Sequence, residues 1–348
     1  MVDSTFNPNQ TPNFALGMGC SIPLCVGMAA NIFLFYALLS VKIESRLTKL
    51  LLRTQAATDM LSCFWNTVFI WIRNFPYTSH VVGWIHCHVW RTQTPYWLVT
   101  ASSTYNLTFI LLNRIWATVY CATYRRYEKA YIICTMFTNI TLSILVVSPG
   151  PFIVIFENMT CITQITPNQQ IVYRLALIYQ PFWCVVYYLM PIAIMLVAHI
   201  RLVFYFGSEE LKTQGEEHQI QPNNWSISVN VQSEPLSEEP AELPPFVDPL
   251  HRSMSIGSFC MICFMFLAHT YDTINFLLPS LVSSYFYDYG SDTQLISLFI
   301  STANTIANPV IIILSVPCIR TFLFTSLTAR SRHLKRTIRQ LFSWDKRS

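Results

Sequence analysis

One carboxylate stands midway along an apolar stretch of the chain, where Asp59 occurs in the sequence Gln-Ala-Ala-Thr-Asp-Met-Leu. An ionisable group is costly inside a membrane, so it is a functional candidate by default. Polar residues at matching depth in other apolar stretches could converge on it, namely Asn31, Ser103, Asn304 and Asn308. A carboxylate ringed by hydroxyl and amide oxygens suits a small hard cation such as sodium. The alternative is a buried hydrogen-bond network that fixes helix packing.

A second polar group, His269, Tyr271, Asp272 and Asn275, lies in the apolar stretch 252–283. Asp272 could pair with a cationic ligand group, but the residue types alone favour hydrogen bonds to a neighbouring helix. An intramembrane enzyme would need a converging catalytic set, and His269 and Asp272 have no evident nucleophile or further metal ligand with them. We therefore predict that the protein is not an enzyme.

Three further residues in apolar stretches have properties that matter in a membrane, two prolines and one arginine. Pro191 and Pro309 each leave a backbone carbonyl without its intrahelical partner, so both helices can kink there. Arg114 lies near the end of its stretch, where an arginine commonly reaches towards the lipid headgroups.

The elements that must position these residues are long apolar stretches. Of the 348 residues, 53% are hydrophobic and 11% are charged, whereas about 25% are charged in an ordinary soluble domain. Seven stretches are long enough to cross about 30 Å of hydrocarbon, and they cover about 15–41, 50–74, 89–120, 129–156, 171–206, 252–283 and 291–316. The sequence therefore predicts an all-α membrane protein, a seven-transmembrane helix bundle with the lipid bilayer as its partner and no nucleic acid.

The remaining segments complete the predicted organisation. We expect an extracellular tail at 1–14, transmembrane helices one to five within 15–206, helices six and seven within 251–316, and a short amphipathic eighth helix with a basic tail at 317–348. The acidic, Pro-rich segment 207–250 cannot bury a core and predicts a flexible cytoplasmic loop. Lys and Arg follow the first, third and seventh stretches, so the positive-inside rule places the N-terminus outside and the C-terminus in the cytoplasm of a multi-pass plasma-membrane protein.

The predicted outer side carries two kinds of covalent candidate. Asn9 and Asn158 begin Asn-x-Thr sequons for glycosylation. Cys87, just before the third stretch, and Cys161, after the fourth, both fall on the oxidising side and are candidates for a disulfide that pins the outer loop.

These residues, in this order on these stretches, resemble the signature of rhodopsin-like (class A) G-protein-coupled receptors over about 20–330. Asn31 and Asp59 match the polar residues of helices one and two, and Pro191 matches the helix-five proline. The matches on helices three and seven are Ser103, Leu107, Arg114, Asn304, Asn308 and Pro309. The resemblance implies a sodium pocket at Asp59, Ser103, Asn304 and Asn308, and it shifts our expectation from a structural network to an ion site.

Because of its departures from the family pattern, the chain resembles a divergent member of the family, and we expect one of the invertebrate peptide-receptor type. Asn113-Arg114-Ile115 stands where Asp-Arg-Tyr is typical, and Ile312 stands where the helix-seven motif has Tyr. The resemblance implies that Arg114 meets the G protein when helices five and six swing apart at their inner ends. Because Asn113 cannot form the usual carboxylate pair, we expect Arg114 to be held less tightly in the inactive state.

The ligand is the least determined part of the prediction. Tyr96 stands where aminergic receptors have Asp, and Thr302 stands where opsins have Lys, which disfavours both classes. The expected outer pocket is lined by Tyr96, Trp97, Thr100, Asp272 and Asn275. Aromatic walls with one carboxylate suit a basic or amidated peptide, so a neuropeptide is favoured over lipid, small-metabolite and chemosensory ligands.

The sequence thus predicts a receptor that binds an extracellular ligand and activates a heterotrimeric G protein, with arrestin and receptor kinases as further partners and no cofactor except an allosteric sodium ion. A transporter or channel that uses the same polar residues is the rival class, as is an orphan receptor of the chemosensory type. No internal repeat or pair of broken helices in matching halves supports transport.

Overall fold

The computed structural model describes residues 14–43, 45–72, 79–162, 170–219, 249–281, 291–325 and 328. Its elements are α1 (Phe14–Ser40), α2 (Arg46–Trp71), α3 (His80–Ile85), η1 (His86–Arg91), α4 (Thr94–Val119), α5 (Cys121–Val147), η2 (Gly150–Ile153), β1 (Ile155–Glu157), β2 (Thr160–Ile162), α6 (Gln170–Trp183), η3 (Cys184–Leu189), α7 (Met190–Gln219), α8 (Pro249–Leu281) and α9 (Asp292–Ser315). The predicted sequon at Asn9, most of the acidic loop and nearly all of the basic tail lie outside the described residues.

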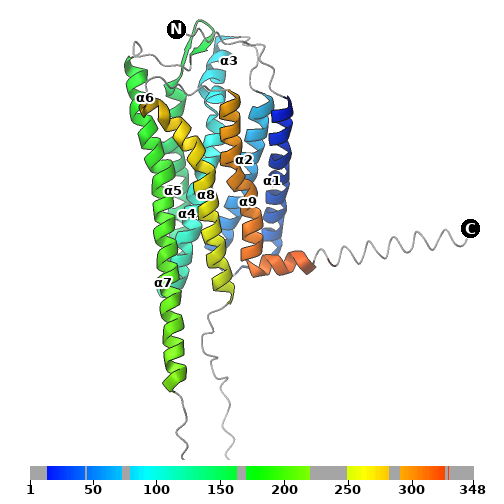
Figure 1. Cartoon of the computed structure of the whole chain (residues 1–348), viewed down its shortest axis with the longest axis vertical. Helices are drawn as coiled ribbons and strands as arrows, with labels where there is room; N and C mark the ends of the chain where they lie inside the picture. Colours follow the sequence, from blue (N-terminus) through cyan, green and yellow to red (C-terminus); the bar gives the residue numbers. More distant parts are fainter. Residues whose placement is uncertain are drawn as a thin grey trace, which may run out of the picture.

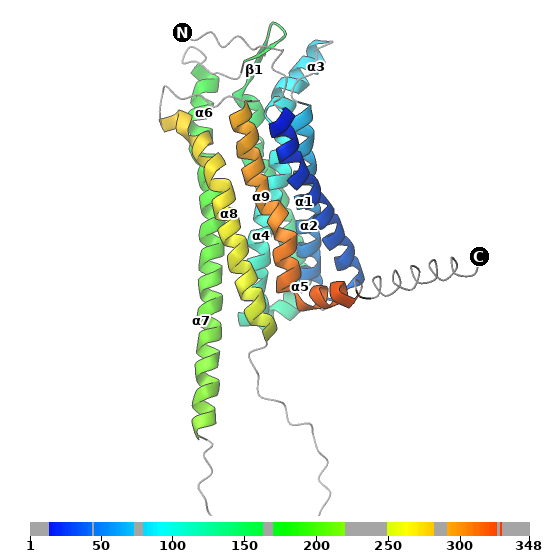
Figure 2. The ribbon, with the colours of Figure 1, turned by 45° about the vertical axis from the view of Figure 1, so that its right-hand side comes forward.

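The protein is a helical membrane protein. Among the described residues, five helical segments are long and apolar enough to cross a bilayer, and they are Phe14–Ser40, Cys121–Ile153, Ile171–Ser208, Ile256–Leu278 and Asp292–Ser315. These segments confirm five of the predicted spans. The predicted spans on α2 and α4 remain predictions, although both helices pack within the same bundle (Figures 1 and 2).

The long helices run side by side, with α3 and the small sheet at the end where α1 begins (Figure 1). The strands β1 and β2 form an antiparallel hairpin in which Phe156 faces Cys161. At the opposite end, residues 317–325 form a helix that turns sideways from the foot of α9 (Figure 2). Ile319 and Leu323 of this helix are buried while Phe324 is exposed, an amphipathic pattern that agrees with the expected eighth helix.

Several helix ends differ from the predicted ones for local reasons. The fourth span was expected to continue to 156, but α5 ends at Val147 because Pro149 and Pro151 follow it at once. The predicted loop at 207–250 is shorter, since α7 continues to Gln219 and α8 begins at Pro249. Ser45 and Ser291 fix the starts of α2 and α9, where each side chain accepts a backbone N–H of the first turn.

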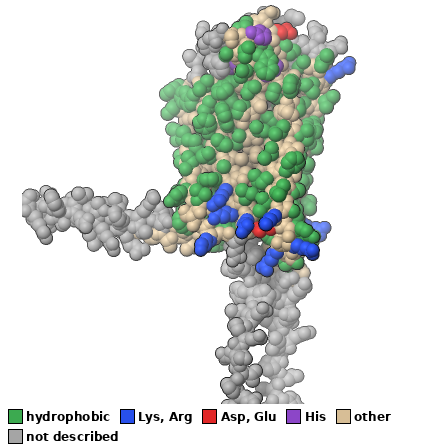
Figure 3. Space-filling model, turned by 180° about the vertical axis from the view of Figure 1, so that it is seen from behind, with side chains coloured by type: hydrophobic (Ala, Val, Ile, Leu, Met, Phe, Trp, Pro, Cys, Tyr) green, Lys and Arg blue, Asp and Glu red, His purple; other side chains and the backbone are tan. Residues whose placement is uncertain are grey.

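The bundle interior combines a hydrophobic core with buried polar side chains, and its outer surface is apolar. The completely buried polar side chains include Asn31, Gln55, Asp59, Asn66 and Asn308. In contrast, Ile133 and Phe137 of α5 are 71% and 70% exposed. Hydrophobic side chains cover the middle of the bundle, and most of the visible Lys and Arg gather at one end of it (Figure 3). Lipid is the surrounding that satisfies such a surface.

Gly257 marks a close approach of α8 to the end of α9. A Cβ atom at this position would lie 1.7 Å from Ser315 Oγ and 2.6 Å from Ser315 Cβ. Gly257→Val should therefore push the two helices apart and lower the free energy of unfolding by about 1–3 kcal/mol, measured by thermal unfolding of the purified protein. Gly19→Val on α1 is the matched control, because no heavy atom lies within 4 Å of its Cβ position. Equal melting temperatures for the two variants would contradict this packing.

Candidate functional site

Asp59 lies at the centre of a hydrogen-bond network that joins α2, α4 and α9. Its Oδ1 accepts hydrogen bonds from Ser103 Oγ and, over 2.9 Å, from Gln55 Nε2. Its Oδ2 accepts one from Asn308 Nδ2 over 2.8 Å. The carboxylate is completely buried, so these donors replace the water it would otherwise need. The predicted convergence of Asp59, Ser103 and Asn308 is therefore present in the geometry.

Gln55 extends the network further along α2 and α4. Its Nε2 also donates to Ser103 Oγ over 2.7 Å, and its Oε1 accepts from Asn106 Nδ2 over 2.8 Å. The same Asn106 amide donates to the carbonyl of Leu51 over 2.9 Å. The sequence analysis missed Gln55 and Asn106. The helical period could have identified both residues. Gln55 lies four residues before Asp59, and Asn106 lies three residues after Ser103, so each pair shares one helix face.

The two other residues of the predicted polar core have different roles. Asn31 donates from Nδ2 to the carbonyls of Gly27 and Thr305, each over 3.0 Å, and so joins α1 to α9. Asn304 is buried one turn before Asn308. The Oδ1 atoms of Asn31, Asn304 and Asn308 are buried and accept no hydrogen bond from the described residues. Amide oxygens are thus present in the core alongside the carboxylate.

A cation at Asp59 would have to share the oxygens that Gln55 already contacts. The Gln55 amide nitrogen donates hydrogen bonds to both Asp59 Oδ1 and Ser103 Oγ. These two oxygens are also hydrogen-bonded to each other. Its N–H groups present positive partial charge to the place that an ion would take. The residues therefore do not fit a sodium ion in this arrangement of side chains, although the oxygen types suit one. The described residues also contain no group of three or more His, Cys, Asp or Glu side chains that could hold a metal.

Both predicted prolines leave a carbonyl that a side chain of another helix satisfies. Pro309 lies inside α9, and the carbonyl four residues before it, that of Thr305, accepts the Asn31 amide. Pro191 follows the π-helical turn η3, in which Met190 N donates to the carbonyl of Val185. In that register Pro191 would have donated to Val186, and Tyr105 Oη of α4 donates to this carbonyl over 3.0 Å.

At the end of the bundle where α9 ends, Asn113 packs against α2. Its Nδ2 donates to Thr48 Oγ1 over 2.8 Å. Nearby, the Ser45 hydroxyl bonds that of Tyr124, and Glu128 Oε1 accepts the backbone N–H groups of Arg46 and Leu47 at the start of α2. A carboxylate suits this helix N-terminus, where N–H groups lack intrahelical partners. These bonds link α2, α4 and the first turns of α5.

The other residues of the expected switch pack in the core next to this end. Arg114 and Ile115 are partly buried on α4. Ile312 is 1% exposed and belongs to the hydrophobic core that also contains Leu51, Leu111 and Ile319. Ile312, which stands where the rhodopsin-like receptors have a Tyr, therefore makes apolar contacts in this protein.

Three of the residues predicted to line a ligand pocket form hydrogen bonds with neighbouring helices. Tyr96 Oη bonds Thr302 Oγ1 over 3.0 Å and the Thr100 hydroxyl bonds that of Ser62 over 3.2 Å, so both side chains join helices. Asp272 accepts a hydrogen bond from Ser297 Oγ over 2.6 Å. Trp97 alone of the predicted set lines one of the cavities described here, which has a volume of about 30 Å³.

Aromatic side chains fill much of the half of the bundle nearest α3 and the small sheet. Trp97 packs edge-on against Trp183 with ring centroids 5.4 Å apart, and Trp183 packs on Tyr187 at 4.4 Å. Tyr187 Oη bonds His269 Nδ1 over 3.1 Å, which joins η3 to α8. This contact agrees with the neighbour-helix interpretation of His269. A second cavity of about 30 Å³ lies between α2, η1 and α9, where Asn66, Trp90 and Gln294 contribute to its wall.

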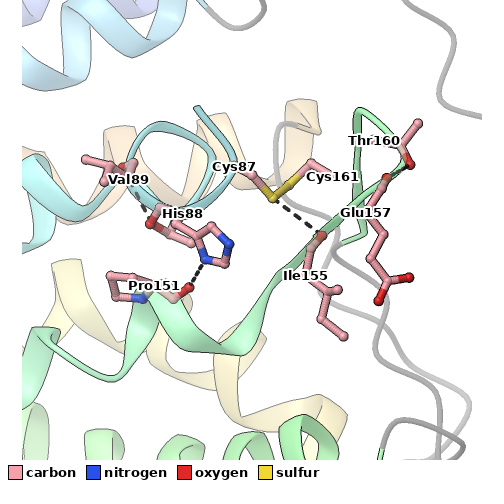
Figure 4. Close-up of a disulfide and its surroundings, with 9 residues drawn as sticks. Cys87, His88, Val89, Pro151, Ile155, Glu157, Thr160 and Cys161 are labelled. Atoms are coloured by element: carbon pink, nitrogen blue, oxygen red, sulfur yellow. Dashed lines mark hydrogen bonds between the residues drawn. A yellow bond between two sulfur atoms is a disulfide. The ribbon is translucent and has the colours of Figure 1, made fainter. Parts of the chain in front are cut away.

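The predicted disulfide between Cys87 and Cys161 is confirmed. It joins η1 to β2 with a Cα–Cα distance of 5.4 Å (Figure 4). Next to it, His88 Nδ1 lies in hydrogen-bond contact with the Pro151 carbonyl, so η1 is tied to the segment after α5 at two points. Asn158 lies at the hairpin turn with a positive φ of 49° and is exposed. Its glycosylation remains a prediction that this exposure permits.

Comparison with known proteins does not assign the chain to a family, since no protein-family model and no curated protein matches it.

The bond from Tyr105 to Val186 can be tested by removing one oxygen. Tyr105→Phe keeps the ring and leaves the carbonyl that Pro191 frees without its donor, so the free energy of unfolding should fall by about 1–3 kcal/mol. Tyr36→Phe on α1, whose side chain is 60% exposed, should change it little. Thermal unfolding of both purified variants measures the difference. A Tyr105→Phe protein as stable as the wild type would show that the carbonyl needs no donor.

The disulfide can be tested with a matched cysteine. Cys87→Ser opens a loop of 74 residues, for which chain entropy sets a stabilisation of about 4 kcal/mol. We expect strongly reduced surface expression and a lower melting temperature. Cys25→Ser, at a free and exposed cysteine of α1, should behave like the wild type. Normal surface expression and stability of Cys87→Ser would show that the bond is dispensable.

Proposed function

We propose that the protein is a divergent rhodopsin-like G-protein-coupled receptor, with seven transmembrane helices and a short eighth helix along the inner membrane surface. One observation carries this proposal. Asp59, Ser103 and Asn308, which match the family pattern in their order and in the helices that carry them, contact one another through one carboxylate. Asn31 joins the same region from α1 through the Thr305 carbonyl.

In this proposal, α2 and α4 are transmembrane helices despite their polar residues. Those residues face the interior, where Gln55, Asp59 and Asn106 are completely buried and hydrogen-bonded to one another. A polar helix can cross a bilayer when its polar groups are satisfied within the bundle. The helix at 317–325 would lie at the inner headgroups, with Ile319 and Leu323 packed on the bundle.

Signalling would then be a shift between two packings of one bundle, with an agonist that binds the open packing more tightly and a G protein that binds it from inside. Arg114 would contact the G protein, since its guanidinium presents several donors and remains charged. Asn113 is bonded to Thr48, so it stabilises the inner ends of α2 and α4 and does not supply the carboxylate restraint of the family. Arrestin and receptor kinases would act on the same inner face.

We propose a neuropeptide as the extracellular ligand. The aromatic cluster of Trp97, Trp183 and Tyr187 has rings suited to cationic or aromatic ligand groups. Trp183 and Tyr187 are buried in this packing, so a ligand that reaches their rings would have to separate side chains as it binds. A chemosensory ligand is the alternative within the receptor class. The N-terminus would lie outside the plasma membrane and the C-terminus in the cytoplasm.

The decisive experiment is G-protein dissociation in cells that express the chain, challenged with pooled amidated peptides, amines and lipids. Arg114→Ala should raise the half-maximal agonist concentration about ten- to hundredfold or abolish the response, because charge-assisted hydrogen bonds contribute about 1.5–3 kcal/mol. Arg174→Ala, at an exposed arginine near the start of α6, is the control for loss of a cationic side chain. Both variants are compared at equal surface expression.

A full response from Arg114→Ala would overturn the proposed role of this residue. Ligand-independent substrate flux into liposomes that contain only this protein would instead favour a transporter, in which Asp59, Arg114 and Asp272 line the pathway.

A further inference from the structure

The Gln55 amide holds the position in the polar core where an ion would otherwise be expected. Its nitrogen lies 2.9 Å from Asp59 Oδ1 and 2.7 Å from Ser103 Oγ, so the two N–H groups of one amide address both oxygens. Its carbonyl is engaged as well, by the Asn106 amide at 2.8 Å. Gln55 is completely buried, and every hydrogen-bonding group of its side chain has a partner.

The Ser103 hydroxyl shows why an ion and this amide compete. Its proton is donated to Asp59 Oδ1, and the oxygen accepts the Gln55 N–H. A cation that coordinates Ser103 and Asp59 needs lone pairs of the same oxygens. It would also lie against amide hydrogens that carry positive partial charge. The two occupants therefore exclude each other unless Gln55 rotates away and gives up its contacts.

The second carboxylate oxygen is also satisfied by the protein. Asn308 Nδ2 donates to Asp59 Oδ2 over 2.8 Å, and Asn308 comes from α9. Amide and hydroxyl donors thus surround both oxygens without an added ion. Such donors preferentially stabilise the charged form of a buried carboxylate.

We propose that Gln55 is a built-in substitute for a monovalent cation at Asp59, so that the protein neither binds nor responds to sodium in this pocket. The inference rests on the proposed function in that it assigns the same polar core a different regulation. In this proposal the Gln55 side chain alone prevents sodium binding. An apolar residue of similar length at position 55 would remove the competing amide and leave the oxygens of Asp59, Ser103 and Asn308 free to coordinate a cation.

The test uses the purified full-length protein and sodium chloride itself as the probe. Thermal unfolding is compared in sodium chloride and in choline chloride at equal ionic strength. Wild type should melt at the same temperature in both salts. Gln55→Leu should be less stable in choline and should gain at least about 2 °C in sodium, as expected for a site that becomes mostly occupied. The double variant Gln55→Leu, Asp59→Asn should lose this gain.

Several outcomes decide the matter without any ligand or G protein. Sodium-specific stabilisation of the wild type that Asp59→Asn abolishes would overturn the proposal, as would a Gln55→Leu protein that folds and ignores sodium. Gln55→Met serves as a second variant if Gln55→Leu fails to fold, and the wild-type comparison stands by itself. A failed G-protein assay would overturn the proposed receptor function and leave this result untouched.

Discussion

The structure depends on the cost of leaving a polar group without a partner in hydrocarbon. Water cannot satisfy such a group inside a bilayer, so the protein must supply the partner itself. The prolines show this most directly. Pro309 and Pro191 free the carbonyls of Thr305 and Val186, and Asn31 and Tyr105 donate to them from α1 and α4. Two local breaks in helices thereby become two fixed contacts between helices.

The sequence predicts the elements well because each one is encoded locally. Long apolar stretches specify helices, and the outer positions of Cys87 and Cys161 led to the disulfide that the structure contains. The errors at helix ends arise where composition changes gradually. The polar residues after Phe206 resemble a loop in composition, yet they favour helix well enough for α7 to continue to Gln219.

The site was harder to predict than the fold, because it depends on which partner each side chain selects. Family resemblance pointed to Asp59, Ser103 and Asn308 but not to Gln55, whose amide competes for the same oxygens. Likewise, the sequence does not reveal that the hydroxyl of Tyr96, a predicted pocket residue, bonds Thr302 of α9. A residue type shows what a side chain can bond, and only the packing of the helices determines what it does bond.

Two kinds of contact hold the helices together at the end of the bundle where α9 ends. Glu128, Tyr124 and Asn113 connect α2, α4 and α5 by hydrogen bonds, which would have to break if these helices separated. In contrast, α8 approaches the last turn of α9 where Gly257 leaves no room for a Cβ atom beside Ser315. Separating α2, α4 and α5 would thus cost hydrogen bonds, whereas the close spacing of α8 and α9 depends on the absence of one side chain.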